Sequence, residues 1–200
     1  MERADSIILA CGALSHELVA LKRQFGWDNL AIQCLPAELH NRPEQIVPKL
    51  EPLIHKAQLQ YDNVLIGYAD CGTGGRIDSL ARKYNLQRLP GAHCYEFFAT
   101  TPLFERLSNE NLGTFYLTDF LARHFERLMI RGYKLDKHPE LKGMLFSNYT
   151  KMVYLTQIEH PERLKQAEAA AHWLGVPLEI HHTGYGDLGQ SVSHFLQVTQ

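Results

Sequence analysis

Three cysteines stand where an apolar run of the sequence meets a turn. Cys11 ends the run SIILAC, Cys71 lies in YADCGTGG, and Cys94 lies in LPGAHCYEFF. Short apolar runs that end at glycine or another turn residue indicate buried strands, and ligands of open parallel sheets bind beyond the carboxyl ends of the strands. We therefore expect the three thiols to converge at one edge of a sheet.

The chemistry expected of these residues is that of thiolates. Backbone N–H groups and the positive end of a following helix lower the pKa of a thiol, so we expect a lowered pKa at Cys11 and Cys71. Three thiolates with one open position suit catalytic zinc, and an iron–sulfur cluster with one non-cysteine site is the alternative. Free cysteines are also often small core residues, and this interpretation applies best to Cys34, inside the apolar run LAIQCL.

The glycines after Cys71 are candidates for binding a cofactor or substrate anion. Gly72, Gly74 and Gly75 allow the backbone to approach a ligand closely, and their N–H groups suit an anion nest. The stretch DCGTGG lacks the Gly-Lys-Ser/Thr ending of a phosphate-binding loop and the spacing of a dinucleotide fingerprint. A tight turn that requires glycine explains the same residues equally well.

Acidic and histidine side chains near the thiols are candidates for proton transfer. Asp70 and Glu96 flank Cys71 and Cys94, and each suits either a general base or a partner of a metal ligand. His40, in LPAELHNRPE, is placed to reach the same sheet edge. His182 and Asp187 surround another glycine-containing turn and are second-tier candidates.

The composition limits the class of protein. The 200 residues are 45% hydrophobic and carry a formal charge of -2, which is typical of a globular chain with one sizeable core or two tight lobes. Such a balanced charge disfavours nucleic acid and anionic membranes as partners. The start MERADSIILACGAL does not have the pattern of a signal peptide, so we expect a cytoplasmic protein with reduced thiols.

Periodicity predicts strands that alternate with helices. We expect strands at 6–10, 30–35, 63–68, 151–157 and 176–182, and helices at 14–25, 44–58, 76–84, 120–132, 161–175 and 192–196. This order predicts an α/β fold with a mainly parallel, doubly wound sheet in a three-layer α/β/α arrangement. We expect a single domain over residues 1–200, with a soft lobe boundary near 108–113.

Five segments together resemble a known family. ACGAL, LPAELHNRPE, YADCGTGG, AHC and GTFYLTDF are similar, in order and over nearly the whole chain, to the prokaryotic family called domain of unknown function 1638. The resemblance implies that Cys11, His40, Cys71 and Cys94 are motif residues, and it implies an association with corrinoid-dependent methyl transfer and one-carbon metabolism. One departure is that the family pattern has an acidic residue between the histidine and the cysteine of this motif, whereas His93 and Cys94 are adjacent here. Glu96 is the residue that could replace the missing acid.

Three hypotheses follow for the function. The first is a metal-thiolate enzyme, a transferase or lyase of small-molecule metabolism, with Cys11, Cys71 and Cys94 as zinc ligands. The second is a cofactor-free enzyme similar to racemases and lyases, in which Cys11 and Cys71 act as acid, base or nucleophile. The third is a non-enzymatic metal or corrinoid accessory protein. The expected partner is a small-molecule substrate, and a corrinoid protein and a homo-oligomer stay open.

Overall fold

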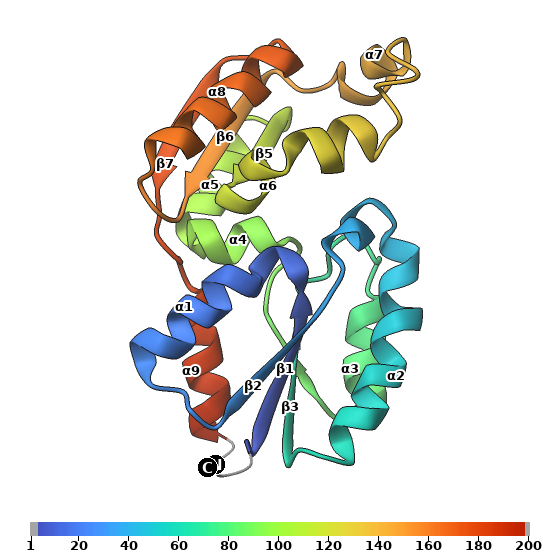
Figure 1. Cartoon of the computed structure of the whole chain (residues 1–200), viewed down its shortest axis with the longest axis vertical. Helices are drawn as coiled ribbons and strands as arrows, with labels where there is room; N and C mark the ends of the chain where they lie inside the picture. Colours follow the sequence, from blue (N-terminus) through green and yellow to red (C-terminus); the bar gives the residue numbers. More distant parts are fainter. Residues whose placement is uncertain (1–3, 199–200) are drawn as a thin grey trace. The chain divides into compact units, whose positions relative to one another are not determined.

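The computed structural model describes residues 4–198. The chain divides into two compact units, each with its own sheet and core. We call the first the N-terminal unit; it comprises the residues up to Cys94 together with those from Asp187 onward. The second, the central unit, runs from Tyr95 to Gly186. Figure 1 shows the helices and strands of both units.

The sheet of the N-terminal unit has four parallel strands in the order β2-β1-β3-β4. Their bounds are β1 (Ser6–Cys11), β2 (Leu30–Leu35), β3 (Asn63–Gly67) and β4 (Gln87–Arg88). Ala10 is paired with Gly67 on one side and with Cys34 on the other. A Cβ at Gly67 would lie 2.7 Å from the Ala10 Cβ, so close strand packing requires glycine here.

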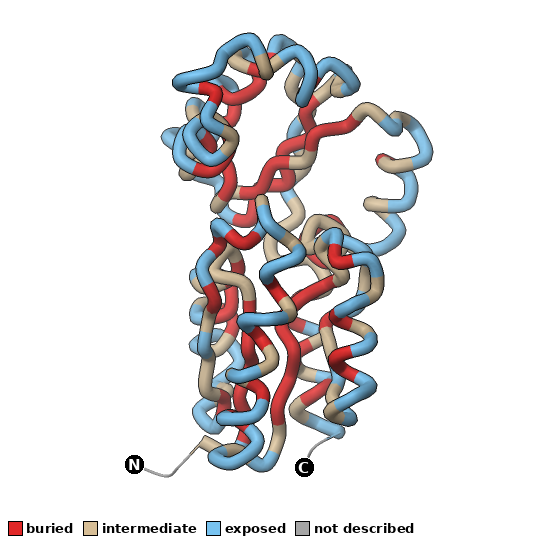
Figure 2. Tube along the Cα trace, turned by 90° about the vertical axis from the view of Figure 1, so that its right-hand side faces the viewer, coloured by how far each residue is buried: buried red, intermediate tan, exposed pale blue. Residues whose placement is uncertain are grey.

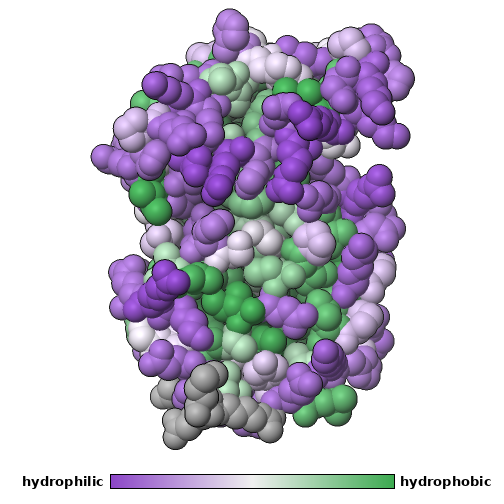
Figure 3. Space-filling view, viewed as in Figure 1, coloured by the Kyte–Doolittle hydropathy of each residue, from purple (hydrophilic) through white to green (hydrophobic). Residues whose placement is uncertain are grey.

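Helices cover both faces of this sheet (Figure 1). The helices of the unit are α1 (Ser15–Phe25), α2 (Ile46–Gln58), α3 (Arg76–Tyr84) and α9 (Leu188–Val198), with short 3-10 helices at Gly12–Leu14, Ala37–Asn41 and Pro43–Gln45. One core cluster joins α2 and α3 to the side chains of Ile7, Leu9 and Ile66. On the opposite face, α9 packs closely on α1, where a Cβ at Gly189 would lie 3.2 Å from Leu21 Cδ2. Figure 3 shows apolar side chains reaching the surface over the edge strand β2.

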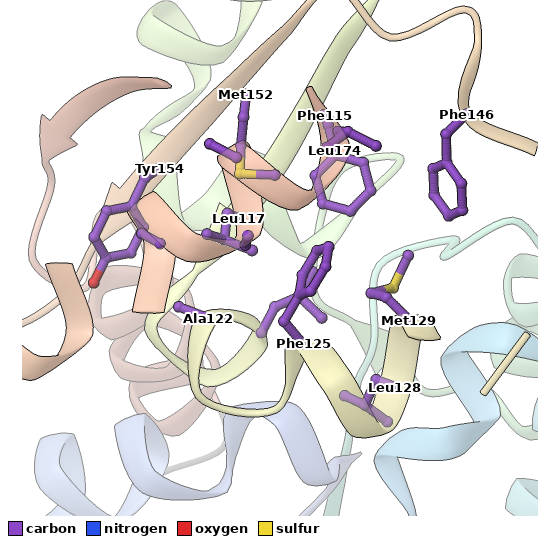
Figure 4. Packing of buried hydrophobic residues seen from close by; sticks show 14 of the residues in the cluster. Phe115, Leu117, Ala122, Phe125, Leu128, Met129, Phe146, Met152, Tyr154 and Leu174 are labelled. Carbon is purple, nitrogen blue, oxygen red and sulfur yellow. The ribbon is translucent and has the colours of Figure 1, made fainter. Parts of the chain in front are cut away.

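The central unit has a three-stranded parallel sheet in the order β5-β6-β7. Its elements are β5 (Thr114–Thr118), β6 (Lys151–Thr156), β7 (Leu178–His182), α4 (Cys94–Ala99), α5 (Thr101–Glu110), α6 (Asp119–Arg123), a π-helix (Glu126–Arg131), α7 (Leu141–Phe146) and α8 (Pro161–Leu174). The core packs aromatic and aliphatic side chains from β5, β6, α6, α8 and the π-helix (Figure 4). The buried stretches of both units follow their central strands (Figure 2).

The predicted α/β class with parallel strands covered by helices is confirmed, but the strands form two sheets. The expected lobe boundary near 108–113 falls within the central unit, between α5 and β5. The helix predicted at 120–132 is interrupted at His124, so that α6 ends and a π-helix follows. Within the described residues, no helix is long and apolar enough to cross a membrane.

Candidate functional site

Cys11 and Tyr68 are brought side by side by the register of β1 and β3. Ala10 of β1 is paired with Gly67 of β3, so the residues that follow them, Cys11 and Tyr68, are neighbours. Side chains alternate between the faces of a sheet, and Tyr68 follows Val64 and Ile66 toward α2 and α3. Cys11 and Cys71 both pack against this same core cluster. The carboxyl ends of β1 and β3 thus place two thiols and a phenol on one face.

The Tyr68 hydroxyl is buried beside these thiols. Tyr68 is 2% exposed, and its hydroxyl oxygen has no well-aligned hydrogen bond within residues 4–198. The Cys11 sulfur is within reach of this hydroxyl, which can donate to it. Burial, followed by the charges of Cys11, Cys71 and Cys34, raises the pKa of Tyr68 well above its ordinary value. Tyr68 is therefore a protonated donor beside the thiols.

Cys71 is held in an uncommon backbone conformation. Its φ is 49°, in the left-handed region that non-glycine residues adopt at a cost of about 1–2 kcal/mol. Gly72, Gly74 and Gly75 continue the turn with φ of 76°, 65° and 81°. The Cys71 N–H donates to Ala92 O at 2.9 Å, which fixes this turn against the segment that precedes Cys94. The turn therefore holds the Cys71 side chain against the core cluster.

The lowered thiol pKa expected from the sequence is wrong for the protein without a ligand. Burial raises the pKa of Cys11 to about 11, although the Ala13 backbone N–H opposes the shift. Burial and the nearby Cys11 charge raise the pKa of Cys71 to about 12, against the backbone N–H groups of Cys94 and Ala69. The N–H group of the following turn is present at Cys11, whereas those at Cys71 come from Ala69 and Cys94, and at both thiols removal from water has the larger effect.

The anion nest expected at the glycines is filled by the protein itself. The Asp70 carboxylate accepts hydrogen bonds from Gly74 N at 3.1 Å, Gly75 N at 2.7 Å and Thr73 Oγ1 at 2.7 Å. Although burial opposes it, these hydrogen bonds lower the pKa of Asp70. Gly74 and Gly75 thus use their donors on Asp70, and the geometry favours a turn-forming role for this carboxylate.

Cys94 and Cys34 complete the set of thiols. No disulfide joins the four cysteines, and all four are half-buried. The backbone N–H of Cys94 approaches the Cys71 sulfur, whereas Cys34 lies opposite Ala10 on β2. Among the residues described, no three histidine, cysteine or acidic side chains are grouped closely enough to hold a metal ion. The three-cysteine zinc site therefore stays a prediction, as does the iron–sulfur alternative.

The remaining candidates lie in different places. His40, in the 3-10 helix Ala37–Asn41, is exposed, yet the surrounding protein and the His93 charge lower its pKa. Glu96 lies in the first turn of α4, two residues after Cys94, and is counted with the central unit. His182 ends β7, with its Nδ1 3.5 Å from Glu159 Oε1, and Asp187 is the first residue after the central unit. Their predicted roles stay predictions.

Tyr68 was not among the residues singled out from the sequence. Its signal was present, because Val64, Ile66 and Tyr68 share the period of a strand and only Tyr68 carries a polar group. A tyrosine at the end of an apolar run also fits a position in the core. Only the burial of its hydroxyl distinguishes a residue of the site from an ordinary core residue. Cys11, Cys71 and Tyr68 thus lie together at the edge of the sheet. Because a charge on one thiol raises the pKa of the other, one thiol ionises before the other.

A family model matches most of the chain, and it includes Cys34, His40, Tyr68, Cys71 and Cys94 but begins after Cys11. No curated protein and no solved structure matches the chain. The match extends from residue 34 to residue 192, so it contains the whole central unit and part of the N-terminal unit. The chain therefore belongs to the family described as Protein of unknown function (DUF1638).

Proposed function

We propose that the chain is a small-molecule enzyme whose reacting groups are the paired thiols Cys11 and Cys71. One observation carries the proposal: two half-buried thiols adjoin a buried tyrosine hydroxyl, within reach of the Cys11 sulfur, at the carboxyl ends of parallel strands. Such edges are where open parallel sheets bind ligands. Buried polar groups need partners, and the Tyr68 hydroxyl can donate to the Cys11 sulfur, which supports a role for it beyond packing.

The reaction class that suits two coupled thiols is proton transfer at carbon. The thiolate of one cysteine takes a proton from a C–H bond, and the electron pair of that bond stays on the carbon. The thiol of the other cysteine then returns a proton to the carbon, so the two sulfurs exchange charge states and no redox change occurs. Tyr68 positions the pair by donating its O–H to the Cys11 sulfur when that sulfur is anionic.

The test is hydrogen exchange into carbon acids in D₂O. Metal-free protein is incubated with a panel of amino acids, hydroxy acids and keto acids, and deuterium incorporation is followed by NMR. We expect C11S and C71S each to abolish exchange, Y68F to slow it about tenfold, and C34S to retain it. Equal exchange by C71S and C34S would reject the paired-thiol proposal, as would no exchange with any panel member.

The second candidate function is a metal-thiolate site, with zinc first and an iron–sulfur cluster second. Its support is that Cys11 and Cys71 share one face and that the Cys94 backbone adjoins the Cys71 sulfur. A bound soft cation would supply Lewis acidity and would deprotonate the thiols. Transferase or lyase chemistry in one-carbon metabolism, and an accessory role with a corrinoid protein, belong to this candidate. A reducing cytoplasmic compartment would suit either candidate.

Metal analysis separates the two functions. Protein prepared both aerobically and anaerobically is measured for zinc and iron, alongside C71S and C34S. The metal-thiolate function requires about one equivalent of metal that C71S loses and C34S keeps. Metal content below a tenth of an equivalent in both preparations would remove this candidate and leave the deuterium exchange test as the decisive one.

A further inference from the structure

A cavity lies within the central unit at the carboxyl ends of β6 and β7. Its volume is about 370 Å³, within the usual range for small-molecule sites. The strand residues that line it come from one face, because Tyr154 is paired with Ile180 and Thr156 with His182. These strand ends correspond to the place where parallel sheets bind ligands.

The cavity exists because α8 packs against the sheet through only part of its length. Ala167, Ala170 and Ala171 are buried in the core, and their small side chains bring this part of α8 close to the sheet. Toward the start of the helix, Leu164 is 38% exposed and faces the cavity together with Ile180, which is also 38% exposed. Tyr154 lies at one end of the core cluster (Figure 4). The floor is therefore apolar and partly uncovered.

The rim of the cavity is rich in hydrogen-bond acceptors. Glu159 carries the one formal charge among the residues that line it. The Thr156 hydroxyl donates its hydrogen to Ile158 O at 3.1 Å, so its lone pairs are what it offers. His182 Nδ1 lies 3.5 Å from Glu159 Oε1, and when Nδ1 carries the only ring proton, Nε2 is an acceptor.

Two side chains of the cavity, Tyr154 and His160, carry donors that could bind an anion, but only one of these donors is available. The Tyr154 hydroxyl is committed to Asp119 Oδ1 at 2.5 Å. His160 Nδ1 accepts from Glu162 N at 3.2 Å, so its neutral ring offers a single N–H through Nε2. One donor faces two neutral acceptors and the Glu159 carboxylate, and this balance favours a ligand that donates hydrogen bonds and carries a positive charge.

We propose that this cavity, lined by Tyr154, Leu164, Ile180 and Glu159, binds a small amine with an apolar body. The apolar body covers the floor, and the ammonium group lies at the rim, where it donates to the Glu159 carboxylate. The residues that line this cavity all belong to the central unit, and the proposal does not depend on the function proposed for the thiols.

The test compares three probes of one shape on the full chain. Phenethylamine, 2-phenylethanol and 3-phenylpropionate are titrated into ¹⁵N-labelled protein at pH 8 while amide shifts are followed. We expect phenethylamine to bind most tightly, with shifts centred on residues 154–164 and 178–182, and 3-phenylpropionate to bind most weakly. Equal affinity for all three probes, preference for the carboxylate, or no saturable shift would overturn the proposal.

Variants then separate the charge from the apolar floor. Glu159→Gln should weaken phenethylamine at least about threefold and leave 2-phenylethanol unchanged, because an exposed ion pair contributes modestly. Glu168→Gln, at an exposed position on α8, is the matched control and should change neither. Leu164→Ala should weaken both probes. Undiminished amine binding by Glu159→Gln would overturn the assigned role of the carboxylate, and folding is checked from the amide spectrum of each variant.

Discussion

The two sheets of this protein each place an aspartate just beyond a strand, and the two aspartates do different work. Asp70 follows β3 and binds groups three to five residues further along the chain. Asp119 follows β5 and binds groups 35 to 39 residues away, within the neighbouring strand β6 and just beyond its end. One carboxylate therefore shapes a local turn, whereas the other ties two strands together.

The strand ends around the two aspartates also differ in how fully their polar groups are satisfied. Beside Asp119, the Tyr154 hydroxyl and the N–H groups of Gln157 and Ile158 all donate to the carboxylate. Beside Asp70, the Tyr68 hydroxyl has no such acceptor in the described residues and adjoins thiols instead. Two tyrosines at the ends of parallel strands thus differ in their partners: Tyr154 donates to a carboxylate, whereas Tyr68 lies beside thiols.

Removing the Asp119 carboxylate should have the largest effect on stability. Asp119→Ala leaves the buried Tyr154 hydroxyl and two backbone N–H groups without their acceptor, and we expect a loss of about 3–5 kcal/mol in the free energy of unfolding. Urea denaturation measures it, with Asp136→Ala as an exposed control. A loss similar to that of the control would show that Asp119 does not tie the strands together.

The thiols should make the metal-free protein less stable in alkali. The pKa of Cys11 is raised to about 11 and that of Cys71 to about 12, so the folded state keeps its thiol protons at a pH where the unfolded state has lost them. Their stabilisation is fully present below about pH 9 and is lost as the pH rises toward 11 and 12.

Between pH 8 and pH 10 this linkage should cost about 2–3 kcal/mol for the two thiols together. The measurement is urea denaturation across this pH range, comparing the chain with the double variant C11A/C71A. The double variant should show a correspondingly flatter dependence on pH. Parallel pH profiles for the two proteins would mean that these thiols are not desolvated in the folded state.

Asp70→Ala should destabilise the protein less than Asp119→Ala, by about 1–2 kcal/mol, because its partners are local and partly exposed. The variant also leaves the N–H groups of Gly74 and Gly75 without their carboxylate. Added formate should therefore restore part of the lost stability in Asp70→Ala, with no such effect in the unaltered chain. Absence of this rescue would argue against a nest that the Asp70 carboxylate fills.

The comparison also shows which features the sequence could predict. Apolar runs and helical periodicity located β1, β2, β3, β6 and β7, because burial patterns are local. The strand β5 was not predicted, since TFYLT mixes polar and aromatic residues, and its pairing with β6 involves residues far along the chain. The division into two sheets likewise depends on long-range pairing that periodicity does not report.

The candidate site was predicted in part for the same reason. Cys11 and Cys71 could be placed at strand ends from local patterns, and the structure puts both against one core cluster. The filling of the glycine nest by Asp70 and the raised thiol pKa depend on three-dimensional surroundings. Tyr68 became visible only through the buried state of its hydroxyl, which no spacing in the sequence reveals.

The smallest effect on the free energy of unfolding is expected from replacing Glu179 of β7. Its pKa is lowered first by Lys151, whose Nζ lies 2.9 Å from Oε2, and then by His181, whose Nε2 lies 2.6 Å from Oε1. A lowered carboxyl pKa stabilises the folded state above the unfolded pKa, and this stabilisation is lost as the pH falls through the folded value.

Because Glu179 is 41% exposed on its side chain, solvent screens the interaction, and Glu179→Gln should cost at most about 1 kcal/mol at pH 7. The difference between the variant and the unaltered chain should be smaller at pH 4 than at pH 7, because the unfolded carboxylate takes up a proton near its ordinary pKa of about 4.3 while the folded one keeps its charge to a lower pH. Urea denaturation at pH 7 and pH 4 measures it. A loss comparable to that of Asp119→Ala would erase the distinction between a surface ion pair and a carboxylate that ties two strands together, since exposure is what separates them.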